Sequence, residues 1–107
     1  MTIYDLYGSM SEDMAKAKET LEDALEIDFV YKESGYYGGE YFFFGERGKE
    51  NFIIKRNIDP IDGEPAEMKF PGSKILFYVN DTLRASDIHE SVALKAKGFT
   101  LLIRKEM

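Results

Sequence analysis

Apolar and polar residues alternate along the chain with two different periods, which separate predicted helices from predicted strands. Before residue 28 the apolar positions recur every three or four residues, a spacing typical of a helix with one buried stripe: Met14, Ala17, Leu21, Ala24 and Leu25. Ser9 precedes Glu12 by three residues, the spacing of a capping box at a helix start. The pattern predicts a first helix that ends before Asp28.

From Ile27 the period changes to two, which is typical of strands that bury one face. Five segments rich in β-branched and aromatic residues, separated by turn residues, are predicted strands: 27–32, 37–44, 51–58, 74–80 and 99–104. Glycines at 45 and 48 predict a hairpin between the second and third of these strands. Pro60 ends the third strand, because proline lacks the amide donor that a sheet requires.

A second helix is predicted over residues 81–97, with Ser86 as a candidate cap, Gly98 as the stop and a stripe of Ile88, Val92 and Ala96. The predicted order is therefore α-β-β-β-β-α-β. Because the strands are grouped rather than alternating with helices, we expect an α+β fold, with a single antiparallel or mixed sheet of about five strands and two helices on one face. The length predicts a single domain, 1–107.

The aromatic segment 37–44 is divided between the two faces of the predicted sheet. Side chains alternate along a strand, so Phe42 and Phe44 share the face under the helices, together with Glu40. Two helices are too few to cover both faces, so we expect the other face to expose its side chains: Tyr37, Tyr41 and Phe43, with Lys55, Asn57, Tyr78 and Asn80 from neighbouring strands. Cover by residues 3–7 or by the proline-containing loop 59–74 is the alternative.

A double glycine, Gly38-Gly39, interrupts this aromatic segment. Glycine inside a strand pattern is typical of a bulge or bend. We expect such a bulge to change the direction of Tyr37 relative to Tyr41.

Composition narrows the chemistry that the chain can perform. It has no cysteine and one histidine, His89, which we expect at the surface of the second helix. There is no phosphate-binding glycine motif, and the acidic loop 59–64 lacks the ligand pattern of an EF-hand. We therefore expect no catalytic residues, no metal and no cofactor, and hence not an enzyme. A pair of carboxylates brought together only in space is the catalytic arrangement that the sequence leaves open.

The formal net charge is −6 and is unevenly distributed. Residues 1–50 contain 12 acidic and 5 basic side chains, whereas residues 51–107 contain 8 and 9. Phosphate backbones and anionic lipids repel such a chain, so we expect neither a nucleic-acid nor a membrane partner. No apolar run is long enough to span a bilayer, the first ten residues show no secretory signal, and the absence of cysteine suits a reducing compartment. We expect a cytoplasmic protein.

A tyrosine-rich patch bordered by polar groups is typical of a protein interface. The candidate partner-binding residues are the aromatic and acidic side chains of the second and third predicted strands with their neighbours: Tyr37, Glu40, Tyr41 and Phe43, the rim charges Glu33 and Glu46, and the adjacent Asn57 and Tyr78. The same face could instead pair two copies of the chain as a homodimer. Base stacking on RNA is a further alternative that the acidic charge disfavours.

Five segments carry a resemblance to known proteins: YDLYG (4–8), ESGYYGGEY (33–41), ENFII (50–54), RNID (56–59) and LFYVNDTLR (76–84). Together they resemble a group of small, uncharacterised bacterial proteins that are similar in size, acidity and α+β make-up to immunity proteins encoded beside contact-dependent or polymorphic toxins. The resemblance implies a cytosolic immunity protein that binds and neutralises a toxin domain, of a basic, nuclease type. The alternative is a housekeeping domain that binds a small ligand or self-associates through the same aromatic face.

Overall fold

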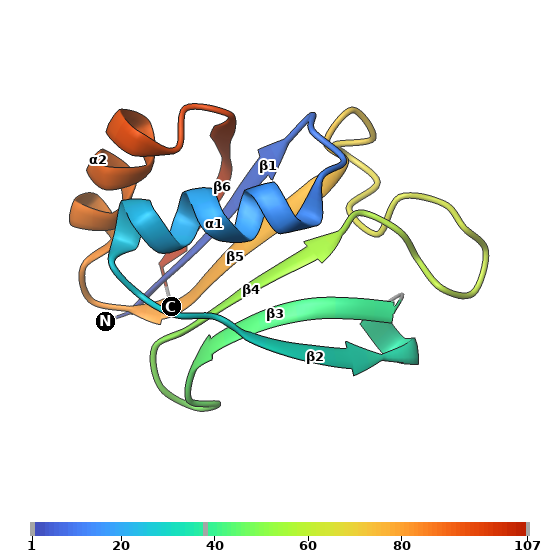
Figure 1. The fold of residues 1–107 in the computed structure, drawn as a ribbon, viewed down its shortest axis with the longest axis horizontal. Coiled ribbons are helices and arrows are strands. Elements are labelled where there is room, and N and C mark those ends of the chain that lie inside the picture. The colour runs from blue at the N-terminus through green and yellow to red at the C-terminus, as the bar shows by residue number, and fades with distance from the viewer. Residues whose placement is uncertain (1, 38, 107) are drawn as a thin grey trace.

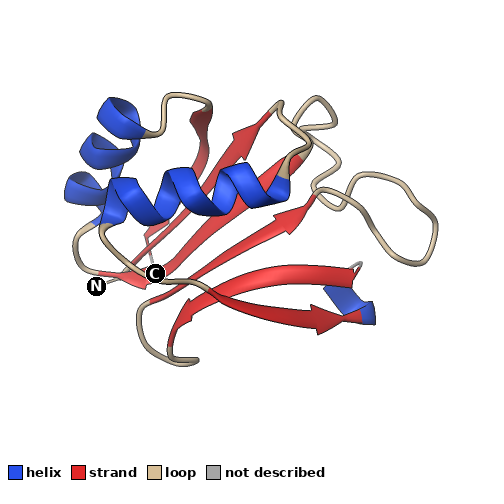
Figure 2. Ribbon diagram, viewed as in Figure 1, coloured by secondary structure: helices blue, strands red, loops and turns tan. Residues whose placement is uncertain are grey.

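The structure is a computed structural model that describes residues 2–37 and 39–106. It is an α+β domain with one open sheet and two helices packed on the same face of that sheet (Figures 1 and 2). The elements in chain order are β1 (Ile3–Ser9), α1 (Met14–Leu25), β2 (Val30–Ser34), the short 3-10 helix η1 (Gly35–Tyr37), β3 (Gly39–Gly45), β4 (Asn51–Arg56), β5 (Ile75–Thr82), α2 (Ala85–Lys95) and β6 (Phe99–Glu106).

All neighbouring strands of the sheet are antiparallel, in the order β2-β3-β4-β5-β1-β6. The predicted antiparallel sheet with two helices on one face is confirmed. The predicted count of about five strands and the order that began with a helix are wrong, because residues 3–9 form the strand β1 between β5 and β6. This segment was considered only as a cover for the sheet.

In the sequence of β1 the alternation of apolar and polar residues is hard to recognise, because a charged residue occupies a buried position. The Asp5 side chain is fully buried, and both of its oxygens accept hydrogen bonds from the Arg104 guanidinium at 2.8 Å. Arg104 lies directly opposite Asp5 on β6. A carboxylate is buried at this depth only when it is paired, and its partner is supplied by the last strand of the chain.

Both predicted helices exist with different ends. The cap of α1 is Asp13, whose carboxylate accepts a hydrogen bond from the Lys16 backbone N–H at 3.0 Å, rather than Ser9. Glu26 ends α1 in the left-handed region, with φ of 56°. Residues 27–29, predicted as strand, precede β2 as an extended link. Helix α2 starts four residues later than predicted, because residues 81–82 belong to β5, and its N-cap residue is Arg84 rather than Ser86.

The main core lies between the helices and the sheet and is built around Phe77 on β5. Phe77 is fully buried, and four aromatic rings from other elements pack on it with centroid distances of 5.6 to 6.4 Å: Tyr7, Phe29, Phe52 and Phe99. Phe42 and Phe44 belong to the same core, as predicted. Leu21 on α1 and Ile88 and Val92 on α2 cover this core on the helix side.

The opposite face of the sheet carries neither α1 nor α2. The long loop between β4 and β5 covers one part of this face. Cover by this loop was one of the two kinds of cover that the sequence left open. A Cβ at Gly8 would lie 2.3 Å from the Ser73 hydroxyl, so the loop touches β1 directly. No helix among residues 2–37 and 39–106 is long and apolar enough to cross a membrane.

Candidate protein-binding face

One row of side chains runs across all six strands on the face opposite the helices. Its members lie directly opposite one another in the sheet register: Val30, Phe43, Ile53, Tyr78, Leu6 and Ile103. We call this set the apolar row. Val30 on the edge strand β2 is 57% exposed, Tyr78 and Ile103 are half-buried, and the other three are buried. Cross-strand neighbours of this kind stabilise a sheet. The row is continuous in register, and it reaches the surface at Val30, Tyr78 and Ile103.

Two tyrosines extend the row on one side. Tyr41 packs with Phe43 and Ile53 in a second cluster, and Tyr37 packs against that cluster. The Tyr37 and Tyr41 rings meet edge to face, with centroids 4.8 Å apart. Tyr37 belongs to η1 rather than to a strand, and this turn places its ring over Tyr41. A bulge was predicted at Gly38-Gly39; Gly38 lies outside the described residues, and Gly39 is the first residue of β3, with a φ of 118°. The apolar row with Tyr37 and Tyr41 is hereafter the aromatic face.

The expected exposure of the two central aromatics is wrong. Tyr41 is 5% exposed and Phe43 is 8% exposed. The Tyr37 ring covers Tyr41, and the cationic groups of Lys32 and Arg47 lie over the Phe43 ring, 5.2 and 5.7 Å from its centroid. Long cationic side chains can cover apolar surface in this way while their charged ends stay in water.

The acidic side chains of the predicted site lie elsewhere. Glu33 and Glu40 are opposite one another on β2 and β3 and share the face of Phe42, on the helix side. Glu40 pairs with Arg56 at 2.7 Å, and Glu33 accepts a hydrogen bond from the Tyr31 hydroxyl. The structure therefore brings the predicted aromatic residues together and separates them from these two acids.

The third predicted acid, Glu46, lies in the exposed β3–β4 hairpin. Its carboxylate is 3.7 Å from the Lys49 ammonium group, so the local charge is balanced. Around Phe43 and Tyr37 the charged groups nearest to the aromatic rings are therefore the cations Lys32, Arg47 and Lys55, although the whole chain is acidic.

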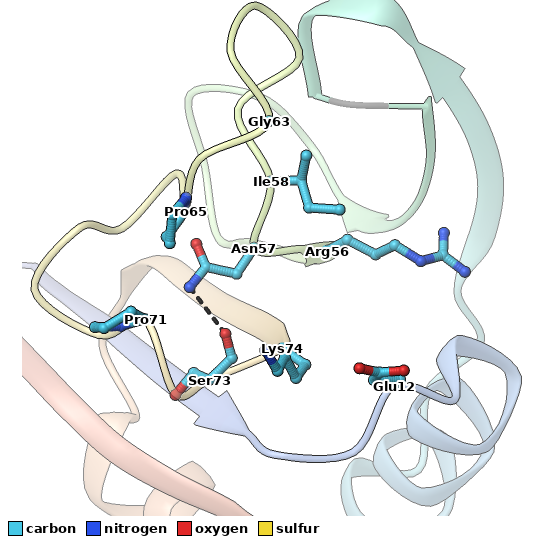
Figure 3. Close-up of a pocket in the computed structure, with 9 residues that line it drawn as sticks. All are labelled: Glu12, Arg56, Asn57, Ile58, Gly63, Pro65, Pro71, Ser73 and Lys74. Carbon is cyan, nitrogen blue, oxygen red and sulfur yellow. Dashed lines mark hydrogen bonds between the residues drawn. The ribbon is translucent and has the colours of Figure 1, made fainter.

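Asn57 and Tyr78 hold the covering loop against the sheet. The buried Asn57 amide donates hydrogen bonds to the carbonyls of Phe70 and Ser73, both at 2.9 Å, and accepts one from the Glu67 backbone N–H at 2.8 Å; the bond toward Ser73 is drawn in Figure 3. The Tyr78 hydroxyl donates to the Glu67 carboxylate at 2.6 Å. Burial, together with this bond, raises the pKa of Tyr78. Because the Asn57 side-chain amide is occupied by its hydrogen bonds to the loop, this residue positions the loop.

The exposure expected for Lys55 and Asn57 on this face is also wrong, because both residues are buried. Lys55 lies between Tyr41 and Leu76 in the sheet register and is only 8% exposed. Its Nζ is 5.7 Å from the centroid of the Tyr37 ring. Burial lowers the pKa of Lys55, although the nearby carboxylates of Glu67 and Asp59 act in the opposite direction. The period-two pattern predicts that Lys55 is on this face, but no sequence signal shows how deeply it is buried.

Two clefts open beside Lys55. The larger, about 690 Å³, lies between η1 and the loop and includes Tyr37, Ile61 and Glu67 in its lining. The smaller, about 230 Å³, is lined by Tyr37, Ile53, Lys55, Tyr78 and Asn80. Lysine 55 therefore separates a cleft under the loop from the open part of the aromatic face.

A third cleft, of about 590 Å³, lies where the loop meets the start of α1. Figure 3 shows Glu12, Arg56 and Lys74 around it, with Pro65 and Pro71 on the loop side. Arg56 is already paired with Glu40, and Asn57 is bonded to the loop. Among the residues that the structure describes, no group of three or more His, Cys, Asp or Glu side chains is placed to hold a metal ion.

His89, expected at the surface of the second predicted helix, is exposed on α2. Its Nδ1 is 3.5 Å from the Tyr7 hydroxyl, and burial raises the pKa of Tyr7 to about 12. This pair is on the helix side of the sheet and is remote from the aromatic face.

A scan against protein-family models found no match to this chain, and a search of curated proteins found no significant similarity. The function is therefore argued from the geometry of the aromatic face.

Proposed function

We propose that this chain is a protein-binding module that docks a partner protein on its aromatic face. The observation that carries the proposal is the apolar row, which continues in register across six strands on a face without a helix. Protein interfaces combine an aromatic, apolar centre with a polar border, and this face has both. Its half-buried tyrosines, Tyr37 and Tyr78, provide rigid contact area with a hydroxyl at the end.

The size of the domain suits this role. A standard interface buries about 800 Å² on each partner. The accessible surface of the described chain is 6427 Å², so such an interface would occupy a modest fraction of it.

The charges at the border indicate the chemistry of the partner. Lys32 and Arg47 lie over Phe43, and neither forms an ion pair with a described residue. A partner surface that presents carboxylates between apolar groups would complement them. The local charges therefore favour an acidic patch on the partner, whereas the net charge of −6 led to the expectation of a basic one.

The partner class that we propose is a toxin domain, which this chain neutralises in the cytosol as an immunity protein. The resemblance of segments such as 33–41 and 76–84 supports this assignment, as do the small size and the acidity of the chain. The gene next to that of this protein is the first place to seek the toxin.

The binding test uses the product of that neighbouring gene and isothermal titration calorimetry. Tyr37→Ala should weaken binding by about 2 kcal/mol, or roughly thirtyfold in Kd. Val30→Asp should weaken it as well, because a carboxylate would enter the exposed end of the apolar row. Leu94→Asp is the matched control, since Leu94 is 63% exposed on α2, on the other face.

Three outcomes would contradict the proposal at different levels. If the neighbouring product does not bind, the immunity assignment is wrong. Suppose instead that it binds, that Leu94→Asp disrupts the complex, and that Tyr37→Ala and Val30→Asp do not. The proposed docking face is then wrong. If the purified chain alone forms a dimer that Val30→Asp dissociates, the face joins two copies of this chain and not a toxin.

A further inference from the structure

On the aromatic side of the sheet, the Lys55 amine has no partner among the described residues. The residue as a whole is 8% exposed, and its amine, which keeps some contact with solvent, forms no hydrogen bond and no ion pair within 4.0 Å with any described residue. Even a partial loss of hydration is unfavourable for an ammonium group unless another charge compensates it. The amine lies instead between the two clefts described above.

The larger of these clefts carries charges of both signs. Lys55 is on its sheet side, and Asp59 and Glu67 are on its loop side. The carboxylates influence the amine electrostatically but lie beyond ion-pair distance from it. A ligand that is purely anionic would meet these two acids, whereas a ligand with both charges can bridge the gap between the amine and the acids.

The two carboxylates keep capacity for such a ligand. Glu67 uses Oε2 to accept the Tyr78 hydroxyl, and the described residues donate no hydrogen bond to its Oε1. Asp59 uses Oδ1 to accept the Ile61 backbone N–H, and Oδ2 is likewise without a donor. Both acids are therefore fixed in position by one oxygen while the other is available.

The remaining walls of the cleft are largely apolar. Tyr36 and Tyr37 come from η1, and Ile58, Pro60, Ile61 and Ala66 come from the loop that follows β4. A volume of about 690 Å³ is within the range of small-molecule sites, which combine apolar walls with a few convergent polar groups.

We infer that this cleft binds a small zwitterion with an apolar body, of the class of an apolar α-amino acid. The ligand carboxylate pairs with Lys55, the ligand ammonium group lies between Glu67 and Asp59, and the apolar side chain contacts Tyr37 and Ile61. No covalent step is involved. The inference does not depend on the protein-binding role, although Tyr37 and Lys55 border both surfaces.

The test is an NMR titration of the ¹⁵N-labelled protein with L-phenylalanine, L-leucine and L-isoleucine. Two derivatives of phenylalanine serve as matched probes: L-phenylalaninamide lacks the carboxylate, and N-acetyl-L-phenylalanine lacks the ammonium group. We expect at least one free amino acid to shift the backbone resonances of residues 35–37, 55 and 58–67 with a Kd in the millimolar range or below. We expect each of the two derivatives to bind roughly tenfold more weakly than L-phenylalanine, or not at all; if leucine or isoleucine binds better, its amide and its N-acetyl derivative take their place.

Variants of the chain connect the signal to the named groups. Lys55→Met keeps most of the side-chain length and removes the charge, so it should abolish the shifts. Glu67→Gln can still accept the Tyr78 hydroxyl and should weaken binding. Lys105→Met, on the exposed end of β6, is the control and should bind as the original chain does. Circular dichroism spectra establish that each variant is folded.

Two results would overturn the inference. One is the absence of any shift in the cleft with all three amino acids up to about 10 mM. The other is binding that persists in Lys55→Met or that is equal for the free amino acid and its two derivatives. Neither result bears on toxin binding, which is measured with a different partner and different variants.

Discussion

Replacing Lys55 by methionine should make the protein more stable at neutral pH, although it removes a polar group from a strand. The stem of Lys55 packs between its neighbours Tyr41 and Leu76, and the residue is 8% exposed. Methionine keeps an unbranched stem of similar length, so most of the apolar contact is retained. The charged end, which has no direct partner among the described residues, is lost.

The magnitude follows from two opposing contributions. Desolvation of the ammonium group destabilises the folded state, and Glu67 and Asp59 offset part of this cost from beyond 4.0 Å. The lowered pKa of Lys55 shows that desolvation is the larger contribution. Replacement of buried charged groups by apolar ones of similar volume is neutral or stabilising by about 1–4 kcal/mol. Because the Lys55 amine keeps some contact with solvent, we expect Lys55→Met to raise the free energy of unfolding by about 1 kcal/mol at pH 7, the lower end of this range.

The pH dependence gives a second, sharper criterion. In the unfolded chain the amine has an ordinary pKa of 10.5, and in the folded chain the pKa is lower. Below its pKa in the folded chain, the amine is charged in both the folded and the unfolded states, so the full desolvation cost lowers the stability of the fold. Between the two values the unfolded state binds more protons, and the stability of the original chain rises with pH. Above 10.5 the amine is neutral in both states, and the cost disappears.

The assay is urea unfolding of the original chain and of Lys55→Met from pH 7 to pH 10.5, followed by circular dichroism. The difference in unfolding free energy between them should be largest near neutral pH and should narrow as the pH rises. Lys105→Met, at an exposed position, should follow the original chain throughout. A variant less stable than the original chain at pH 7, or a difference independent of pH, would refute the reasoning.

Two further predictions concern buried polar contacts elsewhere. Asn57→Ala removes the three side-chain hydrogen bonds that hold the β4–β5 loop. This variant should lower the free energy of unfolding by about 3 kcal/mol and speed amide hydrogen exchange at Glu67. An unchanged exchange rate at Glu67 would contradict the prediction. Arg104→Met leaves the buried Asp5 carboxylate without its bidentate partner and should cost about 2–3 kcal/mol in urea unfolding. Adding Asp5→Asn should restore part of that loss, and an additive further loss would contradict the pairing argument.

The division of the aromatic segment between the two faces could be predicted from the sequence. The period of two assigned Phe42 to the helix side and Tyr41 and Phe43 to the opposite side, as observed. This success has a local cause, because alternation along a strand is a property of the backbone. The helix stripes, such as that of α2, were predictable for the same reason.

The exposure of the same side chains could not be predicted, because it depends on residues from other elements. Tyr41 is covered by Tyr37, which η1 rather than a strand places above it. Phe43 is covered by Lys32 and Arg47, whose side chains lie over its ring. The separation of Glu40 from the aromatic face could be predicted from alternation alone, since Glu40 is two residues from Phe42 on the same strand.

Strand β1 was missed for a related reason. Its buried Asp5 is compatible with a central strand only when Arg104, 99 residues away, lies opposite it. A charge in a short segment therefore conceals a strand when the neutralising partner is distant in the sequence.

The position of β1 also determines the order in which the fold can assemble. It is the first strand of the chain but pairs only with β5 and β6, and even the closest of these paired residues, Ser9 and Ile75, are 66 positions apart. Closing such long loops slows folding, whereas β2, β3 and β4 are joined by short turns. The meander from β2 to β4 can consequently form as a nucleus, with β1 added only when β5 has been synthesised. During translation β1 therefore has no strand to pair with until β5 follows it, and β6 completes its pairing later.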